Sequence, residues 1–247
     1  MADQTRAEIL QSLDHLKAQL DSRRPLDPDL LANLREIYTV RLTYNSTAIE
    51  GNTLTESETQ IILEKGITVG GKPLKDHLEV INHAEAMDFV RELAQMDAPI
   101  TDWEIRQIHG LVCKGDRQAG TYRTVNDMAA GTNYRYPDAV KVPELMTDFN
   151  DWLNQSSSLH PIELATEIHA RLVTIHPFAD GNGRVARLLM NLHLLRTGYA
   201  IAVVQAANRT AYIDAVVSWQ KGDFDPLFFL VADCVQETMT ETLSLVG

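Results

Sequence analysis

Residues 174–191 contain the side chains best suited to chemistry in this chain. The run reads Thr-Ile-His-Pro-Phe-Ala-Asp-Gly-Asn-Gly-Arg-Val-Ala-Arg-Leu-Leu-Met-Asn. Gly181, Asn182 and Gly183 tolerate positive φ angles, so the backbone there can turn its N–H groups inward. A helix that begins behind this loop adds unpaired N–H groups and the positive end of its dipole. The stretch therefore predicts an anion site, best suited to phosphate.

Charged and titratable side chains flank this glycine loop. Arg184 and Arg187 fall in the first turn of the expected helix, where cations oppose the dipole. A bound polyphosphate would resolve that conflict, because arginine binds phosphate bidentately. Asp180 lies beside the same groups, and a carboxylate next to phosphates usually needs a metal ion such as Mg²⁺. His176 precedes the loop, where a neutral imidazole could take a proton.

Two helices must position the loop. The first is indicated by apolar residues at helical spacing upstream, and Pro177 disfavours its continuation through His176. The second is indicated by the same period downstream, at Val185, Leu188, Leu189 and Leu192, and it ends before Gly198. The upstream helix is expected over residues 161–176. Further helices are expected over residues 5–22, 28–50, 55–65, 74–95, 101–112, 143–155, 209–221 and 226–245. Residues 200–207 form a short apolar segment that is expected to be extended.

Local signals define several of these helices. Pro28 is expected at the first position of its helix, and two capping boxes, Thr55 with Glu58 and Thr101 with Glu104, open the helices that follow them. In the helix over 74–95, the expected core positions are Leu74, Leu78, Ile81 and Leu93.

Glu50 is placed unusually for a surface carboxylate. It should end the helix over 28–50, with Gly51 as an ordinary C-cap glycine. A carboxylate at a helix C-terminus opposes the dipole, and no basic residue follows nearby. Glu50 therefore either points into water or takes a cation from elsewhere in the fold.

Composition limits the classes of protein to which the chain can belong. Its 247 residues suit one large domain or a core with a smaller attachment, and 45% hydrophobic content is ample for a buried core. The net charge of −12 argues against nonspecific binding to nucleic acid or to an anionic membrane. Two distant cysteines, no signal pattern and no long apolar run predict a cytoplasmic protein in a reducing environment.

The run from His176 to Arg187 resembles the signature of the Fic (Fido) family, His-Pro-Phe-x-Asp-Gly-Asn-Gly-Arg-x-x-Arg, at every fixed position. The resemblance implies a mainly α-helical bundle, the Fic fold, with a β-hairpin flap beside the active site. It divides the chain into an N-terminal helical region over 1–97, a Fic core over 98–235, and the end of a C-terminal helix over 236–247.

The activity that this resemblance implies is protein adenylyl transfer, which moves AMP from ATP to a Ser, Thr or Tyr hydroxyl of a target protein. His176 would be the general base, and Asp180 would hold Mg²⁺ or Mn²⁺. The loop Gly181–Gly183 would bind phosphoryl oxygens, and Arg184 and Arg187 would neutralise the β/γ end. Tyr212 and Gln220 would lie near the adenosine.

The segment from Ser46 to Gly51 resembles the inhibitory motif Ser/Thr-x-x-x-Glu-Gly/Asn that some Fic proteins carry ahead of the core. In that class the glutamate pairs with the second arginine of the signature, which maps to Arg187. The resemblance thus implies that Glu50, on an inhibitory helix over about 28–50, holds the enzyme in a low-activity state.

Residues 114–141 lose the helical period, and within them Gly120–Arg123 and the segment that continues to Asp138 resemble the Fic flap, whose backbone docks an extended piece of the target by strand addition. Gly131, Thr132 and Asn133 are the expected docking residues. The segment from Ala130 to Pro137 departs from the family pattern because it lacks the His-x-Pro-Pro ending, so target choice does not carry over.

Three other interpretations remain consistent with the sequence. Glu50 could position a water for removal of AMP from modified proteins, which would make the protein a deAMPylase. Related enzymes transfer UMP, phosphocholine or phosphate, although the intact pair Arg184 and Arg187 favours ATP in the usual orientation. The chain could also be a noncatalytic nucleotide sensor or a toxin–antitoxin scaffold. A homodimer is common among relatives of this kind.

Overall fold

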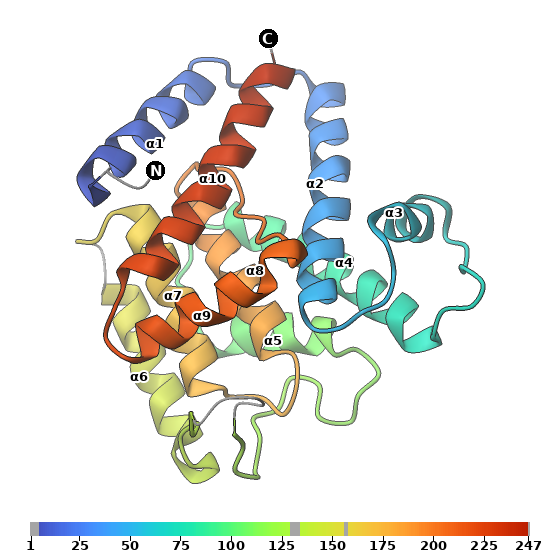
Figure 1. The fold of residues 1–247 in the computed structure, drawn as a ribbon, viewed down its shortest axis with the longest axis vertical. Coiled ribbons are helices and arrows are strands. Elements are labelled where there is room, and N and C mark those ends of the chain that lie inside the picture. Colours follow the sequence, from blue (N-terminus) through green and yellow to red (C-terminus); the bar gives the residue numbers. More distant parts are fainter. Residues whose placement is uncertain (1–4, 129–133, 156–157, 247) are drawn as a thin grey trace.

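A computed structural model describes residues 5–128, 134–155 and 158–246, and these residues are mainly helical (Figure 1). Two short 3₁₀ turns, η1 (Ala139–Lys141) and η2 (Ala206–Asn208), interrupt the connections. The helices are α1 (Arg6–Asp21), α2 (Pro28–Ile49), α3 (Glu56–Lys65), α4 (Leu74–Ala94), α5 (Asp102–Val112), α6 (Val142–Gln155), α7 (Pro161–Ile175), α8 (Asn182–Arg196), α9 (Arg209–Gln220) and α10 (Asp225–Leu245). The mainly α fold class is confirmed.

The helix starts follow the local signals in the sequence. Pro28 occupies the first turn of α2, where an N–H group would have no partner within the helix, so its absence costs no hydrogen bond. Thr55 and Glu58 form a complete capping box at α3, and Thr101 and Glu104 form another at α5. These caps depend only on residues within four positions of one another, so the sequence predicts them well.

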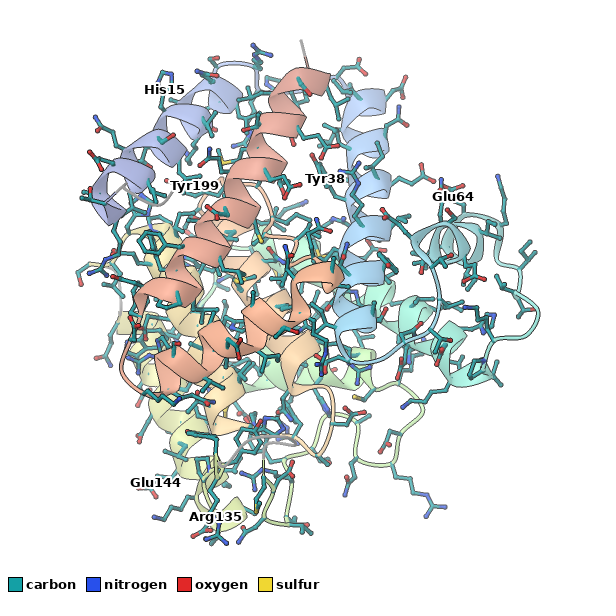
Figure 2. The ribbon with its side chains drawn as sticks, viewed as in Figure 1. His15, Tyr38, Glu64, Arg135, Glu144 and Tyr199 are labelled. Atoms are coloured by element: carbon teal, nitrogen blue, oxygen red, sulfur yellow. The ribbon has the colours of Figure 1, made fainter. Side chains whose placement is uncertain are left out.

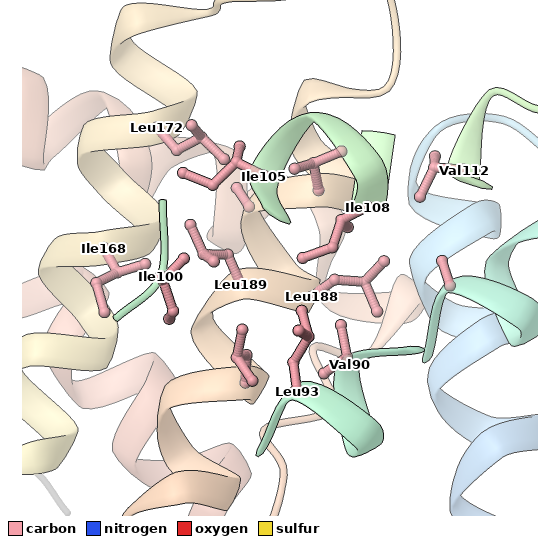
Figure 3. Close-up of a cluster of buried hydrophobic side chains, with 14 of the residues drawn as sticks. Val90, Leu93, Ile100, Ile105, Ile108, Val112, Ile168, Leu172, Leu188 and Leu189 are labelled. Carbon is pink, nitrogen blue, oxygen red and sulfur yellow. The ribbon is translucent and has the colours of Figure 1, made fainter. Parts of the chain in front are cut away.

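Helix α8 lies at the centre of the fold. It packs against α7 along its length and also touches α2, α4 and α5. Its residues from Val185 to Leu192 are fully or almost fully buried on every side, which is typical of a helix that crosses the core rather than covering it. Figure 3 shows the apolar side chains of α4, α5, α7 and α8 converging, among them Val90, Ile105, Leu172 and Leu188.

The prediction of which face of α4 is buried is wrong. Leu74, Leu78 and Ile81 are 67%, 48% and 37% exposed, and of the expected core positions only Leu93 is buried. The buried side of α4 instead mixes apolar residues such as Val80 and Met87 with polar ones. Packing between α2, α5 and α8 selects this face, and hydrogen-bond partners in the fold satisfy its polar groups.

The outer helices complete the bundle. α10 packs on α1 and α9, and α2 runs beside α3 and α4 (Figure 1). Within the described residues, no helix combines the length and the apolar character needed to cross a membrane.

The expected β-hairpin flap is not seen as strands. In the described residues around it, the only β pairing is an isolated antiparallel bridge between Met128 and Arg135. The expected docking residues Gly131, Thr132 and Asn133 lie outside the described residues. Residues 199–205 lie between α8 and η2 and belong to no strand, so the extended segment expected at 200–207 does not pair into a sheet.

Candidate active site

The turn that carries His176 has an uncommon backbone. α7 ends at Ile175, and His176 adopts left-handed angles, with φ 51° and ψ 59°. Positive φ is uncommon for a residue with a side chain and often marks a functional position. The N–H group of His176 still donates to the carbonyl of Leu172 at 2.9 Å, so the conformation closes the helix and turns the chain toward the glycine loop.

Asn182 fixes the loop between the two helices. Its side-chain oxygen accepts from the N–H of Phe178 at 2.9 Å, and its side-chain nitrogen donates to the carbonyl of Phe178 at 2.8 Å. Phe178 itself is fully buried and stacks on His109, with ring centroids 3.7 Å apart. The sequence predicted a phosphate-binding role for the backbone of Asn182 but missed this structural role of its side chain.

His109 supports the loop from α5. Burial lowers the pKa of His109 to about 4, so its ring is neutral at pH 7. Its Nδ1 accepts from the N–H of Gly120 at 2.8 Å, which leaves Nε2 as the protonated nitrogen that donates to the carbonyl of Asp180 at 3.1 Å. One imidazole therefore connects the base of the flap to the loop.

The N-terminus of α8 is open for an anion. Gly181 precedes it with φ 77°, and the first backbone bond of the helix runs from the N–H of Val185 to the Gly181 carbonyl. No acceptor among the described residues bonds to the N–H groups of Asn182, Gly183 and Arg184. Three open donors at the positive end of a helix are the arrangement that the predicted anion site requires.

Both arginines behind the loop are buried and paired with carboxylates. The side chain of Arg184 is 4% exposed and lies 3.1 Å from Asp180 and 3.8 Å from Glu79. Glu79 comes from α4 and was missed by the sequence analysis. The sequence signal for Glu79 is its spacing from His83: the two residues are four positions apart and lie on the same face of the helix.

Arg187 is the most enclosed cation of the site. Its guanidinium bonds Glu50 Oε1 at 2.8 Å, the hydroxyl and carbonyl of Ser46 at 3.0 and 2.8 Å, and the hydroxyl of Tyr212 at 3.1 Å. The carboxylate therefore occupies a guanidinium face that a phosphate would otherwise use. This contact joins residues that are 137 positions apart in the chain.

Glu50 also fills space above the loop. It is the C-cap of α2, and a Cβ atom added at Gly183 would overlap its Oε1 atom. Gly183 thus allows the carboxylate to approach the backbone at the start of α8. The C-terminal end of α2 is held there by Arg209, whose Nε donates to the carbonyl of Ile49 at 2.7 Å.

His176 is mostly enclosed. Its side chain is 19% exposed, and burial lowers its pKa, so the imidazole is neutral at pH 7. Nδ1 lies 3.3 Å from the carbonyl of Val173, which makes Nδ1 the protonated nitrogen and leaves Nε2 as an acceptor. Nε2 lies 3.7 Å from Asp127, and the ring of Tyr136 stacks on the imidazole.

Arg123 ties the flap to this turn. It is 4% exposed, and its Nε donates to the carbonyl of His176 at 2.7 Å. The same guanidinium donates to the carbonyls of Val125 and Pro137, on the two sides of the flap. The sequence resemblance included Arg123 in the flap but did not predict that it would support the histidine.

The two residues expected near the adenosine lie on one face of α9. Tyr212 is buried, and its hydroxyl contacts both Arg187 and Nε2 of His169, the latter at 2.7 Å. Gln220, two turns later, donates to the hydroxyl of Thr174 at 3.4 Å. Tyr212 therefore supports the phosphate end of the site through Arg187.

A metal ion would have few protein ligands here. The described residues contain no group of three or more His, Cys, Asp or Glu side chains that could hold one. Asp180 offers a largely exposed carboxylate, 72% accessible, beside the open N–H groups of the loop. This arrangement fits Mg²⁺, which is typically held by one or two carboxylates together with substrate phosphates and water.

Comparison with known proteins agrees with this geometry. Residues 99–194 match the sequence model of the Fic/DOC family. The solved structure of a Fic domain containing signaling protein from Bacteroides thetaiotaomicron superposes with a TM-score of 0.90 at 29% identity, over 95% of this chain and 97% of that one. Fic-1 from C. elegans superposes with a TM-score of 0.85 at 31% identity, over 97% of this chain and 71% of that one.

Curated relatives carry a named activity. The protein adenylyltransferase Fic of Nematostella vectensis is 35% identical over 96% of this chain and 56% of its own length. The protein of the same name from Drosophila persimilis is also 35% identical, over 96% of this chain and 48% of its own length. The chain thus spans about half the length of the curated relatives it matches.

Proposed function

The chain belongs to the Fic/DOC family, and we propose that it is a protein adenylyltransferase that transfers AMP from ATP to Ser, Thr or Tyr hydroxyls. One observation carries the proposal: a neutral histidine, an open helix N-terminus and two buried arginines surround one loop. The names of the curated relatives support AMP, rather than another group, as the part that is transferred.

In the proposed reaction, His176 takes the proton from the target hydroxyl through its free Nε2. The hydroxyl oxygen then attacks the α-phosphorus of ATP, and pyrophosphate leaves. The N–H groups at the start of α8 stabilise charge on the phosphoryl oxygens. Arg184 and Arg187 bind the β/γ end, and Arg187 does so once the carboxylate of Glu50 is displaced.

Asp180 would hold Mg²⁺ or Mn²⁺ in this site, where the ion would neutralise charge on the phosphates and the leaving pyrophosphate. The groups around Asp180 favour its ionised carboxylate, which is the form that binds a metal ion. Its Oδ1 accepts from the N–H of Gly181 at 2.6 Å, and Arg184 and this bond lower its pKa against the opposing effect of burial.

The ion pair between Glu50 and Arg187 would keep the basal activity low. A charge-assisted hydrogen bond contributes about 1.5–3 kcal/mol, which is about 10- to 150-fold in affinity. ATP must displace this carboxylate from Arg187 and from the space above Gly183. The pair therefore weakens nucleotide binding without abolishing it.

A second candidate function rests on the same residue. Glu50 is partly exposed and lies over the loop, where its carboxylate could position a water for hydrolysis of an AMP–protein bond. In that case Glu50 is catalytic, and the protein is a deAMPylase. The flap as the docking site for the target, a homodimer, the domain boundaries and a cytoplasmic location stay predictions from the sequence.

The test uses ATP labelled on the α-phosphate. Wild type, Glu50→Gly and the double variant Glu50→Gly/His176→Ala are compared for label on the protein itself and on lysate proteins. Label should rise with Glu50→Gly and disappear when His176 is also changed. If Glu50→Gly binds ATP but transfers no label, the adenylyltransferase proposal is wrong. Release of AMP from a pre-AMPylated protein by wild type, lost in Glu50→Gly, would support the deAMPylase instead.

A further inference from the structure

A cavity lies beside the N-terminal half of α2, whereas the proposed phosphate site lies at the C-terminal end of this helix. Its volume is about 280 Å³, it is partly open to solvent, and it is lined by the N-terminal half of α2, the end of α4, residues 199–201 and α10. Figure 2 labels two of its lining residues, Tyr38 and Tyr199, on either side of α10. None of the residues assigned to the phosphate site lines it.

The interior of this cavity is apolar. Leu34, Met87 and Ile201 form buried parts of its wall, with exposed fractions of 6%, 1% and 5%. Apolar surface is unfavourable in contact with water, so a cavity with this lining favours an apolar occupant. The shape and lining therefore suit an apolar group of substantial size.

The charged side chains that line the cavity are arginines. Arg24, Arg35 and Arg91 line it, and no Asp or Glu does, although acidic residues outnumber basic ones by 34 to 22 in the chain. Arg24 pairs with Asp21, and Arg91 pairs with Asp88, both outside the lining. Among the described residues, no hydrogen bond or ion pair engages the guanidinium of Arg35.

Two of these arginines lie close together. Arg91 donates to the backbone carbonyl of Arg35 at 3.2 Å and to the hydroxyl of Thr39 at 2.6 Å. Burial lowers the pKa of Arg91, and the nearby Arg35 lowers it further, against the effect of Asp88. An anion placed between the two guanidinium groups would stabilise both charges.

We propose that this cavity binds a single-chain amphiphile with a carboxylate head, a molecule of the fatty-acid class. The alkyl chain lies against Met87 and Ile201, and the carboxylate meets Arg35 and Arg91. A water-sized group takes about 30 Å³ of liquid volume, so the cavity accommodates a chain of about ten methylene-sized groups. The proposal does not depend on the adenylyl-transfer activity.

Isothermal titration calorimetry of the whole chain tests the ligand chemistry. The probes are decanoate, decanol and decyltrimethylammonium, each below its micelle-forming concentration. Decanoate should bind about tenfold or more tightly than decanol, because charge-assisted hydrogen bonds add to the same apolar burial, and the cationic probe should bind most weakly. Equal affinity for decanoate and decanol, or no binding of decanoate, would overturn the proposal.

Variants locate the site. Arg35→Ala should weaken decanoate about tenfold and leave decanol unchanged, whereas Arg117→Ala, an exposed arginine outside the lining, should change neither. Ala94→Phe fills the cavity and should abolish binding of both probes, with circular dichroism and the thermal midpoint used to show that it folds. A folded Ala94→Phe protein that binds decanoate like wild type would place the binding elsewhere and refute the assignment.

Discussion

The phenol ring of Tyr136 lies flat on the imidazole of His176, with ring centroids 3.7 Å apart and 13° between the ring planes. Tyr136 belongs to the part of the flap where the sequence lacks the family's His-x-Pro-Pro ending. The departure from the family pattern thus coincides with a direct contact on the proposed general base. The ring covers the imidazole and contributes to the burial that lowers its pKa.

Removal of that ring should raise the pKa of His176. Burial holds the pKa of His176 in the folded protein below its ordinary value of 6.5, so exposing the imidazole in Tyr136→Ala moves the pKa upward toward 6.5. An NMR titration of His176 measures this directly. In a Glu50→Gly background, the acid limb of the pH–rate profile should shift to higher pH, since the base works only when neutral.

Tyr136→Phe is the matched control, because it keeps the stacked ring and loses only the hydroxyl. Its His176 titration should follow wild type. A Tyr136→Ala protein whose His176 titrates at the wild-type pH would show that the stack does not set the pKa.

Glu50→Gln should strengthen ATP binding. Replacing the carboxylate by an amide removes the charge that competes with phosphate for Arg187. The expected gain is about tenfold, at the low end for a charge-assisted hydrogen bond, because Glu50 is 38% exposed and solvent screens the pair. Calorimetry with a nonhydrolysable ATP analogue measures the change. Glu36→Gln, an exposed position on the same helix, should leave the affinity unaltered, and an equal gain there would point to net charge instead.

Arg209→Ala should partly release the proposed inhibitory contact between Glu50 and Arg187. Arg209 donates to the carbonyl of Ile49 at the end of α2, and a cation there also interacts favourably with the helix dipole. Without it, Glu50 is held less firmly, so labelling from ATP should rise a few-fold, less than with Glu50→Gly. In the Glu50→Gly background, Arg209→Ala should add nothing, since both changes act on one contact. A loss of activity in that double variant would instead assign Arg209 to nucleotide binding.

Asn182→Ala should lower the thermal stability. The substitution leaves the buried N–H and carbonyl of Phe178 without partners, at a cost of about 1–3 kcal/mol each. For a chain of this length, about 2–6 kcal/mol in total corresponds to a decrease in Tm of roughly 4–24 °C. Differential scanning calorimetry tests this, with Asn33→Ala on the exposed side of α2 as the control. Equal Tm values for the two variants would contradict the structural role of Asn182.

His109 should make the fold sensitive to acid. Its folded pKa of about 4 lies below the unfolded value of about 6.5, so the unfolded state binds more protons between these values. The stability that depends on the neutral ring is complete above pH 6.5 and falls as the pH decreases toward 4, by about 3 kcal/mol in all. Urea unfolding at pH 7 and pH 5 measures the loss.

His109→Gln should reduce the difference in unfolding free energy between those two pH values, because the amide does not titrate. His15→Gln, at an exposed position on α1, should preserve the wild-type difference. An unchanged pH dependence in His109→Gln would assign the acid sensitivity to other groups.

The sequence by itself determined the helices and the loop chemistry. Caps such as Thr55 with Glu58 act over three residues, and the glycine loop proposed to bind phosphate is built from consecutive positions 180–184, so short-range patterns specify both. The expected helix boundaries agree with α1–α10 within one or two residues. The position of Glu50 at a helix C-terminus left open whether it points into water or takes a cation, and only the family resemblance suggested Arg187.

Tertiary packing decided the rest. Leu74 and Leu78 are exposed although their helical spacing suited a core face, because burial is set by which helices surround α4. Likewise, the stack of Tyr136 on His176 joins residues far apart in sequence, and the approach of Glu79 to Arg184 depends on α4 lying beside α8. The local sequence determines which secondary structure each segment can form. The free energy of packing the whole chain selects which faces of these elements meet.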